Sequence, residues 1–205
     1  RDMADAAHCL WAPPGDALYR RYHDEEWGVP EYDDRALFEK LVLDGFQAGL
    51  SWRTILYKRE RFREVFDGFD PERMARYPSA KIEGLLNDPG IIRSRAKIEA
   101  AVGNAKVWLA LMESEPDGFS GFLWRYVDGT PIVGRVVHYR EHRTQSPESE
   151  AMAKELKRCG FKFCGPVIVY AFMQAVGMVN DHEMACPRWQ EIQSSSKRSA
   201  GIPAR

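Results

Sequence analysis

The chain has 205 residues, of which 44% are hydrophobic and 12% aromatic, and its 29 basic and 30 acidic side chains give a net charge of −1. This charge excludes a protein that holds nucleic acid by indiscriminate positive charge, although it is compatible with a local basic face. No apolar run approaches the roughly 20 residues that cross a bilayer, and the first residues lack the pattern of a secretory signal. We therefore expect a cytoplasmic protein with no membrane partner.

Residues 8–32 contain many aromatic rings and few helix signals. From Asp34 onward, apolar side chains recur at helical spacing, and capping residues or prolines mark helix starts. The predicted helices begin near residues 34, 52, 71, 79, 92, 119 and 147. Residues 128–145 have no regular period, and no run of alternating strands is found. The predicted fold class is therefore all-α.

One domain of this class is expected over residues 1–192, built of one or two helical lobes around a central pocket. A mobile tail is expected over residues 193–205, where three serines precede a short basic end. The four cysteines are widely spaced, which favours metal ligands and buried thiols over a disulfide framework.

The stretch from Cys159 to Cys186 contains a predicted hairpin, Gly160-Phe-Lys-Phe-Cys-Gly165, followed by an apolar helix that begins at Pro166. The two glycines allow backbone angles that a β-carbon hinders. Proline suits the first helical turn, and the free N–H groups there attract an anion such as a phosphate, next to Lys162. The simpler interpretation is a tight turn between two packed helices.

Two thiols and two imidazoles form a candidate metal site. His182 and Cys186 are four residues apart, so on a helical turn they share one face. With Cys9 and His23 they supply four ligands, which close a tetrahedral zinc shell and leave no position for water. Such a metal is structural and ties the first residues to the last helix. The alternative is two unconnected buried pairs, since His and Cys are common in cores.

The rings around His23 have two interpretations. Trp11, Tyr19, Tyr22 and Trp27 are either large core residues or the walls of a stacking pocket for a planar ligand. Stacking of a nucleic-acid base on such a ring contributes about 1–3 kcal/mol.

Asp44 lies in an otherwise apolar run, so its carboxylate needs a partner, a function or the exposed side of its helix. Gln47 is about one turn further and can share that face, and its amide both donates and accepts, as the reading of a base edge requires. No nucleophile is signalled, because the sequence shows no G-x-S-x-G motif and supports no Ser–His or Cys–His pairing. A Walker A loop and a dinucleotide fingerprint are also absent.

Several separate stretches occur in one order along the chain. They are Tyr22-His-Asp-Glu-Glu-Trp-Gly-Val-Pro30, Gln47-Ala-Gly-Leu-Ser-Trp52, Asp88-Pro-Gly-Ile-Ile-Arg93 with Lys97-Ile98, Gly160-Phe-Lys-Phe with Phe172-Met-Gln-Ala175, and Asn180-Asp-His182 before Cys186. Together they resemble the bacterial DNA-3-methyladenine glycosylase I family of the helix-hairpin-helix superfamily. The resemblance covers most of the chain, and it implies that superfamily's fold, with the N- and C-terminal segments clasped by one zinc ion.

The resemblance also implies the residues of each site. The zinc ligands are Cys9, His23, His182 and Cys186, and the hairpin residues that hold the DNA backbone are Gly160, Lys162 and Gly165. The base-binding residues are Trp11, Tyr19, Trp27, Gln47 and Trp52, with Tyr22 and Asp44 as the catalytic pair. The chain departs from the family at two positions, since Asp44 stands where glutamate is usual and Phe46 where a small or polar residue is usual.

From this resemblance we expect a monomeric, monofunctional glycosylase that acts on alkylated double-stranded DNA and associates with the nucleoid when bound. It flips the base out, releases free 3-methyladenine and leaves an abasic site. No lysine stands at an evident Schiff-base position, which favours water as the nucleophile. One alternative is a zinc-clasped DNA-binding module without catalysis, in which Asp44 and Phe46 mark a blocked pocket. Another is a zinc hydrolase, which requires an open metal position.

Overall fold

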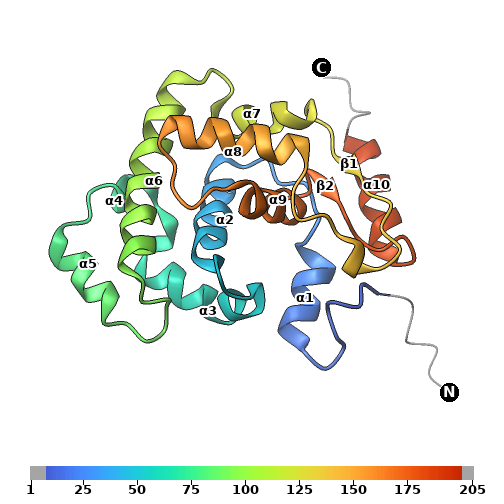
Figure 1. Ribbon diagram of the computed structural model, residues 1–205, viewed down its shortest axis with the longest axis horizontal. Helices are drawn as coiled ribbons and strands as arrows, with labels where there is room; N and C mark the ends of the chain where they lie inside the picture. The colour runs from blue at the N-terminus through green and yellow to red at the C-terminus, as the bar shows by residue number, and fades with distance from the viewer. Residues whose placement is uncertain (1–7, 200–205) are drawn as a thin grey trace. The chain divides into compact units, whose positions relative to one another are not determined.

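The computed structural model describes residues 8–199, which fold mainly into helices and form two compact units (Figure 1). The division falls at residues 31/32, 129/130, 144/145 and 172/173, so that unit 1 takes the two ends of the chain and a middle segment, and unit 2 the rest. The predicted all-α class is confirmed, since the strands within residues 8–199 amount to one short pair. None of the helices described has both the length and the apolar composition needed to span a bilayer.

Unit 2 contains most of the predicted helices. They are α2 (Asp34–Gln47), α3 (Trp52–Val65), α4 (Pro71–Met74), α5 (Ser79–Leu86), α6 (Arg95–Ser114), α7 (Gly118–Trp124), α8 (Pro147–Cys159) and most of α9 (Pro166–Ala175), with 3₁₀ turns at Asp67–Phe69 and Arg125–Val127. The predicted caps are formed, as the Ser51 side chain accepts from the N–H of Thr54 and Ser146 makes a capping box with Ser149.

The core of unit 2 forms around α2. Leu37, Phe38 and Leu41 are buried on it, and Phe46 near its end is 1% exposed. The Phe46 ring packs against Phe62 of α3, with centroids 4.8 Å apart. Residue 46 therefore lies on the face of α2 that packs into the core.

Unit 1 contains α1 (Ala17–Glu25), β1 (Ile132–Val133), a 3₁₀ turn at Tyr139–Glu141, the end of α9, β2 (Val179–Asn180) and α10 (Pro187–Ser199). The strands β1 and β2 pair in parallel, with Ile132 opposite Val179. The helix α1 was not predicted. Its start is capped by Asp16, whose carboxylate accepts from the N–H of Tyr19, and the many rings of this region obscure the helical period.

The helix α10 runs through the region in which a tail was expected. It continues past residue 192 to Ser199, because Ile192 is buried and anchors this turn. The Ser194 and Ser196 hydroxyls donate to the carbonyls of Gln190 and Ile192, one turn before them, so serine is accommodated inside the helix. The rest of the expected tail, residues 200–205, lies outside the described part of the chain.

Candidate metal centre and base-binding site

Four side chains that can ligate a metal converge in unit 1. The Cys9 Sγ lies 3.4 Å from Nδ1 of His182, and the Cys186 Sγ lies 3.7 Å from Nε2 of His23 and 3.8 Å from Nδ1 of His182. All four ligand atoms lie within 4.8 Å of one another, and all four side chains are buried. Ligands of a tetrahedral ion such as zinc lie about 3.3–3.8 Å apart, so the donor set and its spacing fit such an ion.

In each imidazole, the nitrogen that points away from the cluster already forms a hydrogen bond. His182 Nε2 donates to the main-chain carbonyl of Trp27 at 2.8 Å, and His23 Nδ1 lies 2.7 Å from the Asp24 carboxylate, to which it donates. These contacts leave Nδ1 of His182 and Nε2 of His23 as the nitrogens that face the cluster. A hydrogen-bonded carboxylate or carbonyl behind a metal-bound histidine fixes its tautomer and its orientation.

The two thiols of the cluster differ in their readiness to ionise. The hydrogen bond from Cys9, followed by those from His182 and His23, holds the pKa of the Cys186 thiol below its ordinary value, against the opposing effect of burial. The N–H of Glu183 donates to Cys9 Sγ at 3.2 Å. Metal binding to cysteine requires the thiolate, which is favoured at Cys186. At Cys9 the hydrogen bond with Cys186 and burial raise the pKa of the thiol, and the N–H of Glu183 opposes this shift.

The segment from His182 to Cys186 is a turn rather than the predicted helical turn. It follows β2, and the N–H of Met184 donates to the Val136 carbonyl beside β1, which holds the segment against that strand. The His182 ring lies so close to Gly28 that a β-carbon there would be 3.0 Å from it, and the φ of Gly28 is +81°. Glycine is therefore required at position 28 on both counts.

The aromatic residues of unit 1 pack against this cluster. Trp11 lies with its ring centroid 5.1 Å from that of Tyr19 and 4.9 Å from that of Trp27, and Trp27 is 4.6 Å from His182. Tyr22 and Trp27 are buried, whereas Trp11 and Tyr19 are half-buried. Within this unit the rings therefore serve as core around the metal ligands, and the half-buried pair keeps some surface for a ligand.

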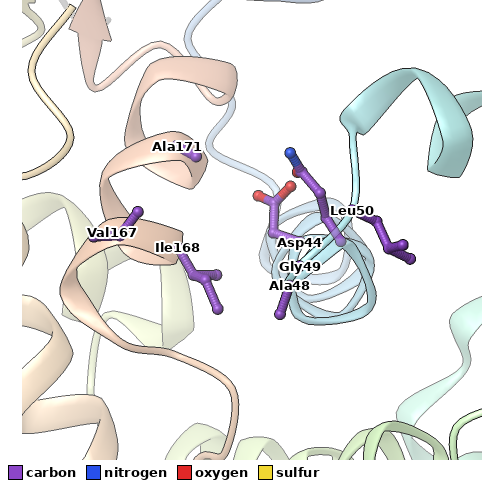
Figure 2. Close-up of a pocket in the computed structure, with 8 residues that line it drawn as sticks. Asp44, Ala48, Gly49, Leu50, Val167, Ile168 and Ala171 are labelled. Atoms are coloured by element: carbon purple, nitrogen blue, oxygen red, sulfur yellow. The ribbon is translucent and has the colours of Figure 1, made fainter.

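Unit 2 has a recess of about 170 Å³ at the end of α2. Its lining residues are Asp44, Gln47, Ala48, Gly49, Leu50, Val167, Ile168 and Ala171. Figure 2 shows the Asp44 side chain projecting from α2 into the space beside α9. The predicted pair Asp44 and Gln47 thus lines one recess. Phe46 does not line it, because its ring is in the core, and the interpretation of Phe46 as a block of the pocket is wrong.

The Asp44 carboxylate is 2% exposed and has one charged neighbour on its own helix. Lys40 Nζ donates to Asp44 Oδ1 at 2.6 Å, while Oδ2 is buried and has no hydrogen-bond partner among the described residues. Burial raises the pKa of the Asp44 carboxyl, and the Lys40 ammonium opposes this shift. The same Nζ lies 3.3 Å from the centre of the Trp52 ring. Lys40 was not predicted as part of the site, although its i, i+4 spacing to Asp44 signals such a pair.

The predicted hairpin is present between α8 and α9. Asn104 of α6 holds Lys162 by both main-chain groups, since its Nδ2 donates to the Lys162 carbonyl at 3.0 Å and its Oδ1 accepts from the Lys162 N–H at 2.9 Å. Gly160 has a φ of +107°, as predicted, but the second left-handed residue is Phe163, with a φ of +56°, rather than Gly165. Gly160, Lys162 and Gly165 are all exposed, which leaves them accessible to a ligand.

The hairpin is also packed against the helix that carries Asp44. A β-carbon added to Gly45 would lie 3.4 Å from Cβ of Phe163. The charge of Asp44 contributes to the raised pKa of Cys164, for which burial is the larger cause. The recess and the hairpin are therefore neighbouring parts of one unit.

Comparison with known proteins identifies the family. The family described as methyladenine glycosylase matches residues 11–189. The DNA-3-methyladenine glycosylase of Haemophilus influenzae is 47% identical over 179 residues, which cover 87% of this chain and 96% of that protein. A crystal structure of 3-methyladenine DNA glycosylase I superposes with a TM-score of 0.85 at 49% identity, over 88% of this chain and 98% of the other.

A further solved structure concerns 3-methyladenine recognition by the Staphylococcus aureus enzyme. It superposes with a TM-score of 0.84 at 39% identity, over 89% of this chain and 96% of the other. The chain belongs to the methyladenine glycosylase family.

Proposed function

We propose that this protein releases N3-methyladenine from alkylated DNA by hydrolysing its N-glycosidic bond, with Asp44 as the carboxylate that binds the flipped base. The observation that carries this proposal is the buried Asp44 on the wall of the recess, with Oδ2 left without a partner among the described residues. A buried acceptor without a partner costs about 1–3 kcal/mol, so such an atom is favoured where a ligand donates to it. The exocyclic amine of an adenine is such a donor.

The first step of the reaction is extrusion of the damaged nucleotide, because its glycosidic bond cannot be reached inside the duplex. The exposed hairpin residues Gly160, Lys162 and Gly165 hold the DNA backbone in this proposal. The first N–H groups of a helix have no acceptor within it and favour a phosphate. In α9 these are the N–H groups of Val167 and Ile168, since Pro166 has none and Val169 donates to the Gly165 carbonyl. Such contacts position the DNA and carry no sequence information.

The chemical step follows from the charge of the damaged base. Methylation at N3 makes the purine cationic and therefore a good leaving group, so little acid catalysis is needed. The protein has to select this base and admit water to the sugar. Asp44 and Gln47 supply acceptors and donors for the base edge, Tyr22 is the second proposed catalytic residue, and Trp11, Tyr19, Trp27 and Trp52 are the proposed stacking residues.

The metal in this proposal is one zinc ion held by Cys9, His23, His182 and Cys186. Two thiolates and two imidazoles are ligands that zinc prefers, and four of them complete its structural coordination. When bound, the ion supplies a cross-link between distant segments of unit 1. The bond-breaking step does not use it, and the nucleophile is water.

The test uses duplex DNA that carries N3-methyladenine, incubated with the purified protein. The proposal expects free 3-methyladenine in the supernatant and an abasic site in an uncleaved strand, at a rate well above spontaneous depurination without protein. Binding of this DNA without release of base would instead support the non-catalytic module.

A further inference from the structure

The proposed site contains a cation of its own. Lys40 and Asp44 are one turn apart on α2, and the ammonium lies 2.6 Å from Oδ1. Lys40 is 15% and Asp44 is 2% exposed, so the pair is largely shielded from water. The ammonium also lies against the Trp52 ring at 3.3 Å from its centre, which gives it a second favourable contact.

The two oxygens of the Asp44 carboxylate differ in their hydrogen bonding. Oδ1 is bound by Lys40, whereas Oδ2 has no hydrogen-bond partner among the described residues and belongs to a residue that lines the recess. Rotation of the carboxylate would break the ion pair. We propose that Lys40 is a positioning residue that keeps Asp44 ionised and oriented, with Oδ1 held on the ammonium and Oδ2 presented to the base.

The charges around Asp44 support this assignment. The residues of α9 that share the recess, Val167, Ile168 and Ala171, are apolar and cannot offset a buried negative charge. From the hairpin, Cys164 interacts with Asp44, but burial raises the pKa of this thiol to about 12, so it stays neutral in the working range of pH. Among the described residues, Lys40 is the group whose positive charge lowers the pKa of the Asp44 carboxyl.

Removal of the ammonium therefore changes the ionisation of Asp44 in a defined direction. Burial raises the pKa of this carboxyl and Lys40 lowers it, so loss of Lys40 raises it further. Asp44 then becomes neutral as the pH falls toward its new pKa, and a neutral acid no longer forms the charge-assisted bond to the base. A cationic base that enters such a site must first displace the proton.

The inference rests on the proposed function and predicts a specific pH profile. Lys40→Met keeps an unbranched apolar chain against Trp52 and removes the charge. Single-turnover release of 3-methyladenine is compared from about pH 6 to about pH 9, a range that lies above ordinary carboxyl pKa values and covers strongly raised ones. Wild type is expected to be flat there. In Lys40→Met, release falls about tenfold for each pH unit below the raised pKa and recovers at the alkaline end.

Three further variants separate positioning from a structural effect. Lys40→Arg retains the cation and is expected to restore the flat profile. Lys40→Met combined with Asp44→Asn is expected to match Asp44→Asn alone, because Lys40 acts through Asp44. Lys106→Met makes the same chemical change at an exposed position of α6 and controls for loss of a positive charge. A uniform decrease with an unchanged profile in Lys40→Met, or an equal loss in the Asp44→Asn background, would overturn the proposal.

A measurement without activity separates this inference from the proposed function. The carboxyl carbon of Asp44 is titrated by NMR in wild type and in Lys40→Met, with Asp44→Asn to assign the signal. Titration of Asp44 at higher pH in Lys40→Met supports the inference, and superimposable titrations refute it. If the wild-type protein releases no base, the proposed function fails, and the NMR titration still decides the role of Lys40.

Discussion

His182 Nε2 donates to the main-chain carbonyl of Trp27 at 2.8 Å, although the two residues are far apart in the sequence. Because a carbonyl only accepts, this bond places the ring proton on Nε2 and leaves Nδ1 free to ligate. The Trp27 ring packs on the same imidazole, with centroids 4.6 Å apart. Trp27, which is proposed to bind the base, therefore also holds a histidine of the candidate metal cluster in place.

Metal removal should lower stability and should not alter the chemical step. We expect one zinc ion per chain by elemental analysis, and chelation should decrease the thermal midpoint because the ion binds only the folded cluster. Cobalt fits the same tetrahedral ligands and should support excision nearly as well as zinc. A large difference in turnover between the two metals, at equal folded fraction, would favour the catalytic-zinc alternative.

Cys186→Ser should lose the metal and destabilise unit 1 by several kcal/mol, since it removes one of four ligands. Cys159→Ser is the matched control, because Cys159 is half-buried and outside the cluster. Metal content and thermal melting are measured for both variants. Equal metal content in Cys186→Ser and wild type would show that the cluster is not the zinc site.

Gly165→Val should weaken binding to DNA of every sequence, with little effect on folding. Gly165 is exposed, its φ is not in the left-handed region, and no atom lies within 4 Å of an added β-carbon. The new side chain should therefore obstruct only a ligand that approaches the hairpin. Affinity is measured by fluorescence anisotropy over a salt series with duplexes of several sequences.

Gly84→Val provides the control for this variant. Gly84 lies on α5, is exposed and likewise has no atom within 4 Å of an added β-carbon. Its DNA affinity should equal that of wild type. If Gly165→Val also binds with wild-type affinity, the hairpin is only a turn.

Asp44→Asn should reduce kcat/KM for release of 3-methyladenine by about ten- to a hundredfold, since a charge-assisted hydrogen bond contributes about 1.5–3 kcal/mol. Base selection should suffer at least as much, because part of the interaction is made with the cationic ground state. Asp44→Glu should be tolerated, as it restores the family's residue. Wild-type rate and selectivity in folded Asp44→Ala would remove Asp44 from the site.

The ion pair between Lys40 and Asp44 means that replacing Asp44 also changes the thermal stability of the protein. Because Asp44→Ala leaves the Lys40 ammonium largely buried without its carboxylate, we expect a loss of about 3–5 kcal/mol in the free energy of unfolding. The variant Asp44→Ala with Lys40→Met should recover part of this loss, and calorimetry of the two distinguishes the effects.

The reaction should end when the base is released, and the DNA strand should remain uncleaved at the abasic site. Lys40 is the amine nearest to Asp44 in unit 2, but the ion pair holds it as an ammonium, which has no lone pair for attack on the sugar. Borohydride added during turnover should therefore trap no covalent protein–DNA adduct. A trapped adduct that disappears in Lys40→Met would identify Lys40 as a nucleophile and overturn the assignment of water.

Most helices were predictable because their starts carry local signals. Ser51, Asp70 and Ser146 each accept hydrogen bonds from the first turn of the helix they precede. The helix α6 begins at Arg95 rather than Ile92, since Ser94 rather than an earlier residue caps it. The helix α1 was missed, because the many rings of this region obscure the helical period and its buried His23 belongs to a cluster that includes His182 and Cys186, far away in the sequence.

The candidate site was predictable in its residue types and less so in its contacts. Ligand chemistry alone left two unconnected buried pairs open, and the family resemblance implied that Cys9 and His182 converge. The turn that presents His182 depends on pairing with residues near β1. The left-handed backbone of Phe163 carries no sequence signal, because glycine is the usual residue there. The burial of Phe46 depends on the rings of α3, which no local pattern reveals.

The division of the chain has a consequence for the order of folding during synthesis. All residues of unit 2 precede residue 173, whereas the cluster of unit 1 needs His182 and Cys186 as well as Cys9, which is 173 residues before His182. Chains emerge from the ribosome with the N-terminal end first, at about 5–20 residues per second. Unit 2, which contains the hairpin and Asp44, can thus fold before His182 and Cys186 are available to Cys9 and His23. If the cluster holds the proposed metal, closure of the long loop between them makes metal capture the last event in maturation, after the part proposed to bind DNA has formed.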